Sequence, residues 1–380
     1  MNDIFLVAAI RTPIGKFGGA LASMTAPDLG VASAKATLAR SGIDLTVVDE
    51  VIFGNARQAG VGPNSARQIA IRSGLRHEVP AYTVNQACGS GLRAIMNAAD
   101  QIRLGQAEVI LAGGTESMSN TPYLLPRARW GVRMGHQELV DGMYRDGFMC
   151  PLADEMMGAT AETLADRYQI SRDEQDRFAL QSQQKAARAT FDGEIVPLDK
   201  LDHDEHRRPD TDLGSLAKLP TVFRQNGTVH AGNSSGITDG AASMLVASAD
   251  AVKVHGLTPM ARIVGYAQAG VDPKIMGIGP VPATRRLLAD TGIVLDDVDL
   301  VELNEAFAAQ VIACDRELHF DPAKLNVNGG AIALGHPIGA TGARIVTTLV
   351  HALHARSKRL GLATLCVSGG MGLSMLVERA

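Results

Sequence analysis

The chain has 380 residues, a net charge of −4, and charged residues at 20% of its composition. This length exceeds one ordinary hydrophobic core, so we expect two or three domains. The small negative charge argues against a nucleic-acid-binding protein, and no stretch holds the roughly 18 apolar residues that a membrane helix needs. Four cysteines without CxxC spacing indicate a reducing compartment. The N-terminal MNDIFLVAAIRTPIG is typical of a first strand rather than a signal peptide, which favours a cytoplasmic protein.

The first predicted unit spans residues 1–117, and residues from about 238 to 258 complete it. Apolar strands in IFLVAA, DEVIFG and EVILAGG alternate with segments of helical periodicity. The helix after Cys88 carries apolar residues at three–four spacing, namely Leu92, Ile95, Ala99 and Ile102. Strands that alternate with helices predict an α/β fold with a parallel sheet covered on both faces.

The middle of the chain, residues 118–237, has a different pattern. It is rich in Arg, Asp, Gln and Met, and its periodicity is broken. Ser171 and Glu174 form a capping-box pattern at the start of one helix. The charged stretch 201–215 is predicted to be a surface loop. We interpret the whole segment as an inserted loop domain of the kind that carries substrate binding.

The last unit, residues 259–380, repeats the first. GIDLTVVDEVIFGN at 42–55 corresponds to GIVLDDVDLVELN at 292–304, and GSGLRAI at 89–95 corresponds to GATGARI at 339–345. In each unit an apolar run then ends in a glycine pair, at Gly114 and at Gly370. The repeat predicts two similar α/β units packed face to face.

The two units differ in the reactive residues at their matching ends. The first offers Cys88, while the second offers Asn304, His336 and Cys366. Cys88 precedes a predicted helix, and the N–H groups and dipole of a helix N-terminus lower the pKa of a thiol. The alternative for Cys88 is a small buried apolar cysteine. A shared active site between the units would bring these groups together.

The residues of the second unit also have structural alternatives. His336 lies at the start of the helix that pairs with the Cys88 helix, or is a loop histidine bonded to backbone. Asn304 sits at a strand-to-helix junction, where asparagine is a common cap. Cys366 ends an apolar strand, where a structural cysteine is equally reasonable. The turn at Gly369 and Gly370 can present backbone N–H groups as an oxyanion hole.

Other catalytic motifs are absent from the sequence. No GxGxxG follows a strand, and neither a phosphate-binding GxxxxGK[ST] nor a serine nucleophile elbow occurs. His203 and His206 fit a solvated loop better than a zinc site, because no further ligands accompany them. We therefore expect no metal and no prosthetic group.

Six segments together resemble the thiolase family, and they follow one another in the family's order. They are VNQACGSG, AGGTESMS, GNSSGITDGAA, NEAF, NGGAIALGHPIGATG and CVSGGMG. The resemblance covers essentially the whole chain. It implies a five-layered αβαβα fold built from two duplicated α/β units, with a loop domain inserted in the N-terminal half.

The resemblance also implies roles for the reactive residues. Cys88 would be the acylated nucleophile, activated by His336, and Cys366 would move the proton to and from the substrate carbon. Asn304 would hold a water in one oxyanion hole, and the backbone N–H groups of Cys88 and Ser368 would form another. The family usually has glycine where Ser368 stands. This set suits the joining of two acyl thioesters, which needs a thiolate carrier, a base and enolate donors.

Coenzyme A would enter as substrate and product. The resemblance assigns Ser235 to the pantetheine and Arg208 to the nucleotide end. The tunnel or acyl pocket would be lined by Phe223, Met157, Met276 and Phe307. Ordinary packing is the alternative for each of these side chains. Short-chain biosynthetic members often have histidine where this chain has Met156, which bears on the shape of the acyl pocket.

The implied activity is the reversible condensation of two acetyl-CoA to acetoacetyl-CoA. A degradative 3-ketoacyl-CoA thiolase of longer-chain preference is the alternative, and a non-catalytic acyl-CoA-binding scaffold is an alternative of another class. Residues 123–134 carry Leu124, Leu125, Trp130 and Met134 among arginines, a composition that favours an interface. We expect a homotetramer, a dimer of dimers, and no nucleic-acid or membrane partner.

Overall fold

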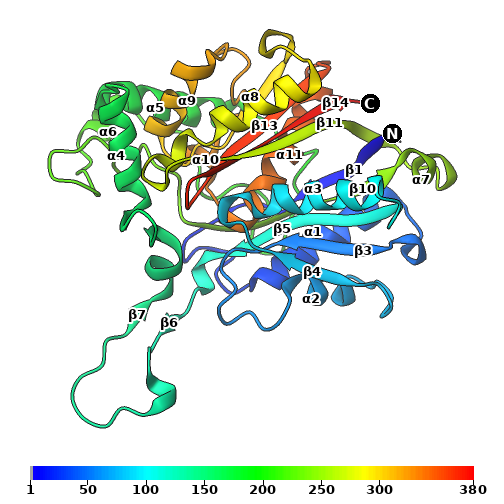
Figure 1. The fold of residues 1–380 in the computed structure, drawn as a ribbon, viewed down its shortest axis with the longest axis horizontal. Helices are drawn as coiled ribbons and strands as arrows, with labels where there is room; N and C mark the ends of the chain where they lie inside the picture. The colour runs from blue at the N-terminus through cyan, green and yellow to red at the C-terminus, as the bar shows by residue number, and fades with distance from the viewer. Residues whose placement is uncertain (1–2) are drawn as a thin grey trace.

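The computed structural model describes residues 3–380 and contains one sheet of ten strands, with helices on its faces (Figure 1). The strands are β1 (Ile4–Arg11), β2 (Gly15–Lys16), β3 (Glu50–Gly54), β4 (Ala81–Val84), β5 (Val109–Ser117), β10 (Thr238–Ser248), β11 (Pro259–Gly270), β12 (Leu300–Leu303), β13 (Leu360–Val367) and β14 (Met371–Arg379). The longer helices of its two halves are α1 (Ala26–Ser41), α2 (Ser65–Arg72), α3 (Ser90–Arg103), α8 (Pro280–Thr291), α9 (Ala308–Leu318) and α11 (Ile338–Ala355). Two short helices, α7 (Ala249–Val254) and α10 (Ala331–Leu334), join elements of the core.

The order of the strands shows the predicted duplication. The sheet runs β12-β13-β14-β11-β1-β10-β5-β3-β4, with β2 beside β10. In one half β5 is parallel to β3 and antiparallel to β10, and in the other β13 is parallel to β12 and antiparallel to β14. The halves meet where β1 pairs with β11. A parallel bridge between Val301 and Leu325 takes the place that β4 has in the first half.

The helices form three layers around the two halves of the sheet (Figure 1). α3 and α11 lie between the halves, in an apolar cluster that includes Leu92, Ile95, Ile345 and Leu349. α1 and α2 cover the outer face of the first half, and α8 and α9 cover that of the second. These layers are the expected αβαβα arrangement. The predicted apolar face of α3 is confirmed, since its four residues are buried.

The repeated sequence at 42–55 and 292–304 folds in the same way twice. Gly42 ends α1 and Gly292 ends α8, both in the left-handed region with φ near 66° and 69°. A short 3₁₀ turn then leads into β3 or β12. Asp49 accepts the N–H groups that begin β5, and Asp299 accepts those that begin β13. The match between these two segments is therefore confirmed.

The central helices cross at two glycines. A Cβ on Gly91 would lie 2.8 Å from the nitrogen of Ala343, and one on Gly342 would lie 2.2 Å from the nitrogen of Leu92. These reciprocal contacts make Gly91 the structural counterpart of Gly342. Aligning GSGLRAI with GATGARI letter by letter would instead pair Leu92 with Gly342, so the structural match is shifted by one residue. The close approach that each glycine allows is to the opposite helix.

The match between the two glycine pairs is wrong. Gly113 and Gly114 lie inside β5, where a Cβ on Gly114 would meet the carbonyl oxygen of Gly339 at 2.2 Å. Gly369 and Gly370 instead form the turn between β13 and β14, both with φ of 87°. The pairs look alike in sequence, yet one makes room for a helix and the other bends the chain.

The inserted segment contains little sheet. It holds the two-stranded ladders β6 (Tyr123–Leu124) with β7 (Val140–Asp141) and β8 (Met149–Cys150) with β9 (Glu155–Met156), and the helices α4 (Met157–Arg167), α5 (Arg172–Arg188) and α6 (Leu213–Ala217). The capping box of Ser171 and Glu174 at α5 is confirmed. The β6–β7 hairpin projects from the body of the protein (Figure 1). The domain boundaries at 118, 238 and 259 stay predictions.

The expectation of a surface loop over 201–215 needs one correction. Asp204 is fully buried and accepts two hydrogen bonds from the guanidinium of Arg11, at 2.6 and 2.9 Å. The charged composition suggested solvent, but this carboxylate anchors the loop to β1. Within residues 3–380, no helix combines the length and the apolar character required to cross a membrane.

We expect Gly342→Ala to lower the free energy of unfolding by about 1–3 kcal/mol, because the new methyl group meets rigid backbone at Leu92. The matched control is Gly30→Ala in α1, where the added Cβ meets the movable end of Ile69 and the helix gains about 0.5–1 kcal/mol in propensity. Urea unfolding of both variants checks this. Equal losses of stability in the two would contradict the close helix crossing.

Candidate active site

Cys88 lies where the chain turns from β4 into α3. A 3₁₀ turn over Ala87–Gly89 leads directly into the helix, and Ala87 takes the left-handed conformation with φ of 46°. Such a conformation is uncommon for alanine and is seen at functional sites. Among the cysteines, Cys88 is half-buried, whereas Cys150, Cys314 and Cys366 are buried. Cys88 is therefore the cysteine with the largest exposed surface of the four.

The electrostatic surroundings of Cys88 differ from the sequence expectation. Burial raises the pKa of the Cys88 thiol, and this effect exceeds the lowering by the N–H of Ser368, the charge of Arg57 and the N–H of Cys88 itself. The helix N-terminus does not produce a free thiolate by itself. Cys88 thus needs a neighbouring base in order to react.

His336 precedes α11, the helix that packs against the turn of Cys88, and is the candidate for that base. Its backbone N–H donates to the carbonyl of Gly236 at 3.1 Å, and its Nδ1 lies 2.6 Å from the hydroxyl of Thr341. The Thr341 hydroxyl donates its proton to the carbonyl of Pro337 at 3.0 Å, so it accepts from Nδ1–H. Nε2 then carries the lone pair, and it has no hydrogen-bond partner among residues 3–380.

The charge state of His336 agrees with this tautomer. Burial, followed by the charges of Arg344 and Arg57, lowers the pKa of His336 to about 3. The imidazole is neutral at physiological pH, and its free Nε2 can take a proton. The alternative that His336 is merely a loop histidine satisfied by backbone is excluded for its side chain.

Asn304 is fully buried at the end of β12. Its backbone N–H donates to the carbonyl of Thr364 at 3.0 Å, which continues the pairing of β12 with β13. Both polar atoms of its amide lack a partner within the described part of the chain. The cap of α9 is Phe307, so Asn304 is not a helix cap. An amide that is buried and unbonded is available to a ligand.

Cys366 lies in β13, next to the side chains assigned to the acyl pocket. One apolar cluster contains Cys366, Met157, Phe223, Met276 and Phe307. The rings of Phe223 and Phe307 meet edge to face, with centroids 6.1 Å apart. Burial and then the nearby Cys88 raise the pKa of Cys366 well above its usual value. Cys366 is therefore a protonated thiol, and the two cysteines influence each other's ionisation.

The turn after β13 places Ser368 beside Cys88. Its N–H group is one of the influences that stabilise a Cys88 thiolate. The left-handed conformations belong to Gly369 and Gly370, and Ser368 is not in that region. Serine therefore fits here without backbone strain, although the family usually has glycine at this position.

The remaining candidates are the residues assigned to CoA binding, and the first of them, Ser235, lies in the GNSSG loop. The N–H of Ser235 donates to the carbonyl of Ala306 at 3.0 Å, and Ser234 forms a bridge with Phe307. Arg208 lines a hollow of about 460 Å³ that also exposes Leu216, Leu219 and Ala231. His206 lines the same hollow and packs against Gly236, whose carbonyl binds His336. Met156 lies opposite Met149 in the short β8–β9 ladder.

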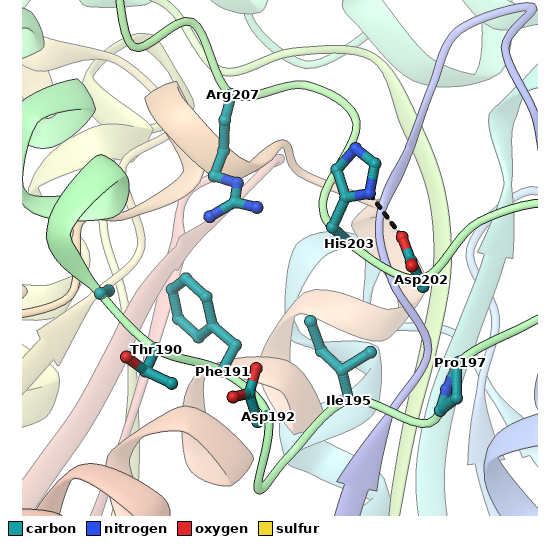
Figure 2. A pocket seen from close by; sticks show the side chains of 9 residues that line it. Thr190, Phe191, Asp192, Ile195, Pro197, Asp202, His203 and Arg207 are labelled. Carbon is teal, nitrogen blue, oxygen red and sulfur yellow. Dashed lines mark hydrogen bonds and ion pairs between the residues drawn. The ribbon is translucent and has the colours of Figure 1, made fainter.

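A second hollow of about 470 Å³ contains none of the reactive residues (Figure 2). It is lined by Ala189, Thr190, Phe191, Asp192, Ile195, Pro197, Asp202, His203 and Arg207. His203 bonds to Asp202 at 2.6 Å and is exposed, so it stands apart from His206. Across residues 3–380, no group of three or more His, Cys, Asp or Glu side chains is arranged to hold a metal ion.

Sequence reasoning missed Glu116, which holds the two halves of the site together. Its carboxylate accepts from the amide of Asn55 at 2.7 Å and from the N–H groups of Ala56, Arg57 and Gly339 at 2.9–3.1 Å. Gly339 begins the helix that follows His336. The motif AGGTESMS contains Glu116, but nothing in it indicated which groups the carboxylate would meet.

Comparison with known proteins shows the family of the chain. The family profile for the thiolase N-terminal domain matches residues 4–250, and that for the thiolase C-terminal domain matches residues 257–379. The chain belongs to the thiolase family. It is 51% identical to an acetyl-CoA acetyltransferase of Pseudomonas aeruginosa and 50% identical to one of Escherichia coli, over all of each chain.

Solved thiolase structures have the same fold. Human mitochondrial 3-ketoacyl-CoA thiolase in complex with CoA is 45% identical, with a TM-score of 0.98 over 100% of this chain and 98% of that one. The acetyl-CoA acetyltransferase of Bacillus anthracis gives a TM-score of 0.97 at 46% identity over 100% and 99% of the chains. The expected thiolase fold is confirmed, and the chain is an enzyme of this family.

The depressed pKa of His336 makes the stability of this thiolase depend on pH. The folded protein resists protonation of His336 down to about pH 3, whereas an unfolded chain takes up this proton near 6.5. The free energy of unfolding should therefore fall as pH decreases from about 6.5, by up to about 1.4 kcal/mol per pH unit for this group. His206, with a pKa lowered to about 4 by burial, acts in the same direction.

The measurement compares urea unfolding of the wild type and His336→Gln between pH 7 and pH 5. The free energy of unfolding of the variant should fall less steeply with decreasing pH, because one fewer proton is taken up on unfolding. Parallel pH dependences of the two proteins would show that His336 is not held neutral by the fold.

Proposed function

We propose that this thiolase is an acyl-CoA C-acyltransferase that condenses two acetyl-CoA reversibly to acetoacetyl-CoA and CoA through an acyl-Cys88. The proposal is supported by the packing of the Cys88 turn against α11, the helix that follows the unbonded neutral imidazole of His336, and by the influence of Cys88 on the second, buried thiol of Cys366. The high identity to acetyl-CoA acetyltransferases supports the choice of acyl group. CoA is substrate and product, and no prosthetic group is needed.

The first half-reaction transfers the acetyl group to Cys88. His336 Nε2 takes the proton of Cys88, and the thiolate attacks the carbonyl carbon of acetyl-CoA. The N–H groups of Cys88 and Ser368 stabilise the oxyanion that develops. The C–S bond to CoA breaks, and the departing thiolate takes the proton of Cys366. The enzyme now carries acetyl-Cys88, protonated His336 and the thiolate of Cys366.

The second half-reaction forms the carbon–carbon bond. The thiolate of Cys366 removes a proton from the methyl carbon of a second acetyl-CoA. Protonated His336 donates to the enolate oxygen together with a water held by Asn304. The enolate carbon attacks the acetyl group, the C–S bond to Cys88 breaks, and His336 returns its proton to Cys88. Cys366 keeps the proton it took, so every group returns to its starting state.

The loop domain supplies the CoA contacts in this proposal. Ser235 would face the pantetheine, and Arg208 would lie at the nucleotide end, where its hollow also presents apolar side chains. Phe223, Met157, Met276 and Phe307 would line the tunnel and acyl pocket, since all four contact the Cys366 cluster. We assign the N-terminal core to residues 1–117 with 238–258, the loop domain that binds CoA to residues 118–237, and the C-terminal core to residues 259–380.

A degradative 3-ketoacyl-CoA thiolase of fatty-acid metabolism is the second candidate. The flexible Met157 and Met276 beside Cys366 favour it, because methionine side chains repack readily around longer chains. The similarity to the human mitochondrial 3-ketoacyl-CoA thiolase is also high. Rates of thiolysis measured over 3-ketoacyl-CoA substrates of increasing length decide between the two.

We expect Cys88, and no other cysteine, to carry the acetyl group when the protein is incubated with acetyl-CoA and its peptides are mapped by mass spectrometry. Cys88→Ser should lose the adduct and reduce turnover by about 10³-fold or more, because a serine hydroxyl is a far weaker nucleophile here. Cys366→Ala should still acquire the adduct, more slowly, yet form no acetoacetyl-CoA.

Cys150→Ala, which removes a buried thiol outside the Cys366 cluster, serves as the control and should behave as the wild type. An adduct on Cys366 with none on Cys88 would reverse the assigned roles. A protein that binds acetyl-CoA but forms no adduct at all would favour the scaffold alternative.

The proposal includes a cytoplasmic homotetramer, a dimer of dimers joined through residues 123–134. Trp130 and Met134 expose 85% and 93% of their surface, and both lie in the projecting hairpin. Apolar side chains so exposed, with arginines beside them, are typical of protein interfaces.

We therefore expect Trp130→Glu to form active dimers in light scattering while the wild type forms tetramers. Val254→Glu is the control, since it places the same charge on another exposed apolar residue, 75% accessible in α7. A wild type that is dimeric at micromolar concentration would refute the tetramer and leave the chemistry of the site unaffected.

A further inference from the structure

A line of polar side chains runs along α11 through the most buried layer of the protein. It consists of Thr341, Arg344, Thr347 and Thr348, each at most 2% exposed. Their spacing of three and four residues places them on one side of the helix. We call these four residues the polar line. It begins at Thr341, which holds His336.

Within the polar line Arg344 faces one side of β12, whereas Thr348 donates to Glu194 at 3.0 Å. Leu300 belongs to the apolar cluster around α11, whereas Val301 and Leu303 belong to the cluster under α8 and α9. Because side chains alternate along a strand, Glu302 shares the α11 side with Leu300, and Asn304 continues that side at the end of the strand. Arg344 confirms the facing, since its Nη1 lies 3.4 Å from Glu302 Oε2.

This contact satisfies only a small part of the polar groups that meet here. Nε and Nη2 of Arg344, Oε1 of Glu302 and the hydroxyl of Thr347 have no partner among the residues described. Buried guanidinium and carboxylate groups are strongly destabilising when they are left unbonded. Internal water satisfies such groups in folded proteins, with two to four polar contacts for each molecule.

We propose that Arg344, Glu302 and Thr347 bind internal water that hydrogen-bonds to the amide of Asn304, and that Arg344 is thereby a positioning residue of the active site. By the alternation along β12, the unbonded amide of Asn304 lies on the same side of the strand as Glu302. A hydrogen bond from this hydrated pair fixes which amide atom faces the reaction. The inference rests on the function proposed above, because it assigns Asn304 its orientation for the enolate.

The chain contains its own comparison for Arg344. The contacts of Gly91 and Gly342 align α3 with α11, so Arg93 is the counterpart of Arg344. Arg93 is half-buried, and its guanidinium donates to Gln86 at 3.0 Å and also to Gln268. The duplicated fold accepts an arginine bonded near the surface at this position. The buried, partly unbonded Arg344 is therefore a feature of the half that carries Asn304 and His336.

The charges around the pair also connect it to the active site. Burial raises the pKa of Glu302 to about 8, with Arg344 opposing this shift and Glu194, Glu305 and Lys185 contributing smaller effects. The charge of Arg344 also acts on His336, whose pKa it helps to lower.

A crystal structure of the wild type at a resolution that shows ordered water tests the binding site directly. We expect water within hydrogen-bond distance of Arg344, Glu302 and Thr347, connected to the amide of Asn304. Empty density among these groups, or a protein group that moves in to pair with them, would overturn the proposal whatever the enzyme's activity.

Kinetics test the positioning role. Thr347→Val keeps the shape of the side chain and removes one water ligand, whereas Thr347→Ser keeps the hydroxyl. We expect Thr347→Val to reduce kcat for condensation by about tenfold with little change in KM, and Thr347→Ser to restore most of it. Arg344→Met should lose about 10- to 100-fold, and Arg93→Met is its matched control with near-normal kcat.

The outcomes separate this inference from the proposed function. A wild type that fails to acetylate Cys88 refutes the function. If the wild type is acetylated and active but Thr347→Val matches it, the positioning role is refuted while the function stands. Equal losses in Thr347→Val and Thr347→Ser would show a packing effect and also refute the role. Should Arg344→Met fail to fold, the two Thr347 variants still decide.

Discussion

The close crossing of α3 and α11 is the constraint on which the rest of the active site depends. Gly91 and Gly342 let the two backbones touch, and this contact sets the distance between the helix starts that carry Cys88 and His336. Glu116 then ties the start of α11 to the segment after β3 by binding N–H groups from both halves. Any side chain at the crossing would separate Cys88 from His336, so the proposed chemistry depends on these two glycines.

Burial determines the charge states that this chemistry requires. Removal from water keeps Cys88 and Cys366 protonated and His336 neutral, so the resting site contains thiols and a base rather than ions. Charge appears only when a thioester accepts electrons beside the N–H groups that are already in place. A permanent thiolate, by contrast, would be open to oxidation and alkylation while it waited for substrate.

Much of this could be predicted from the sequence because the fold is written twice. Gly42 and Gly292 end helices in the same way, and Asp49 and Asp299 bind the equivalent strands β5 and β13, so short identical patterns mark similar structure. The family motifs gave the reactive residues. What could not be predicted depends on contacts between distant segments: the carboxylate of Glu116, the burial of Asp204 against Arg11, and the raised pKa of Cys88. The paired glycines gave a wrong match because Gly113 and Gly114 lie inside a strand, whereas Gly369 and Gly370 form a turn.

The position of β10 has a consequence for how the protein comes into being. This strand lies between β1 and β5, although more than a hundred residues separate it from either of them along the chain. During synthesis β1 therefore waits, unpaired, until residue 248 has emerged, and α3 waits longer for α11 to cover its apolar face. Contacts between residues so far apart in the sequence form slowly, and until they form, apolar surface that promotes aggregation stays exposed. In the proposed mechanism Cys88 has no base within reach during that interval, so a nascent or truncated chain would not consume acetyl-CoA until the last fifth of the polypeptide had been made.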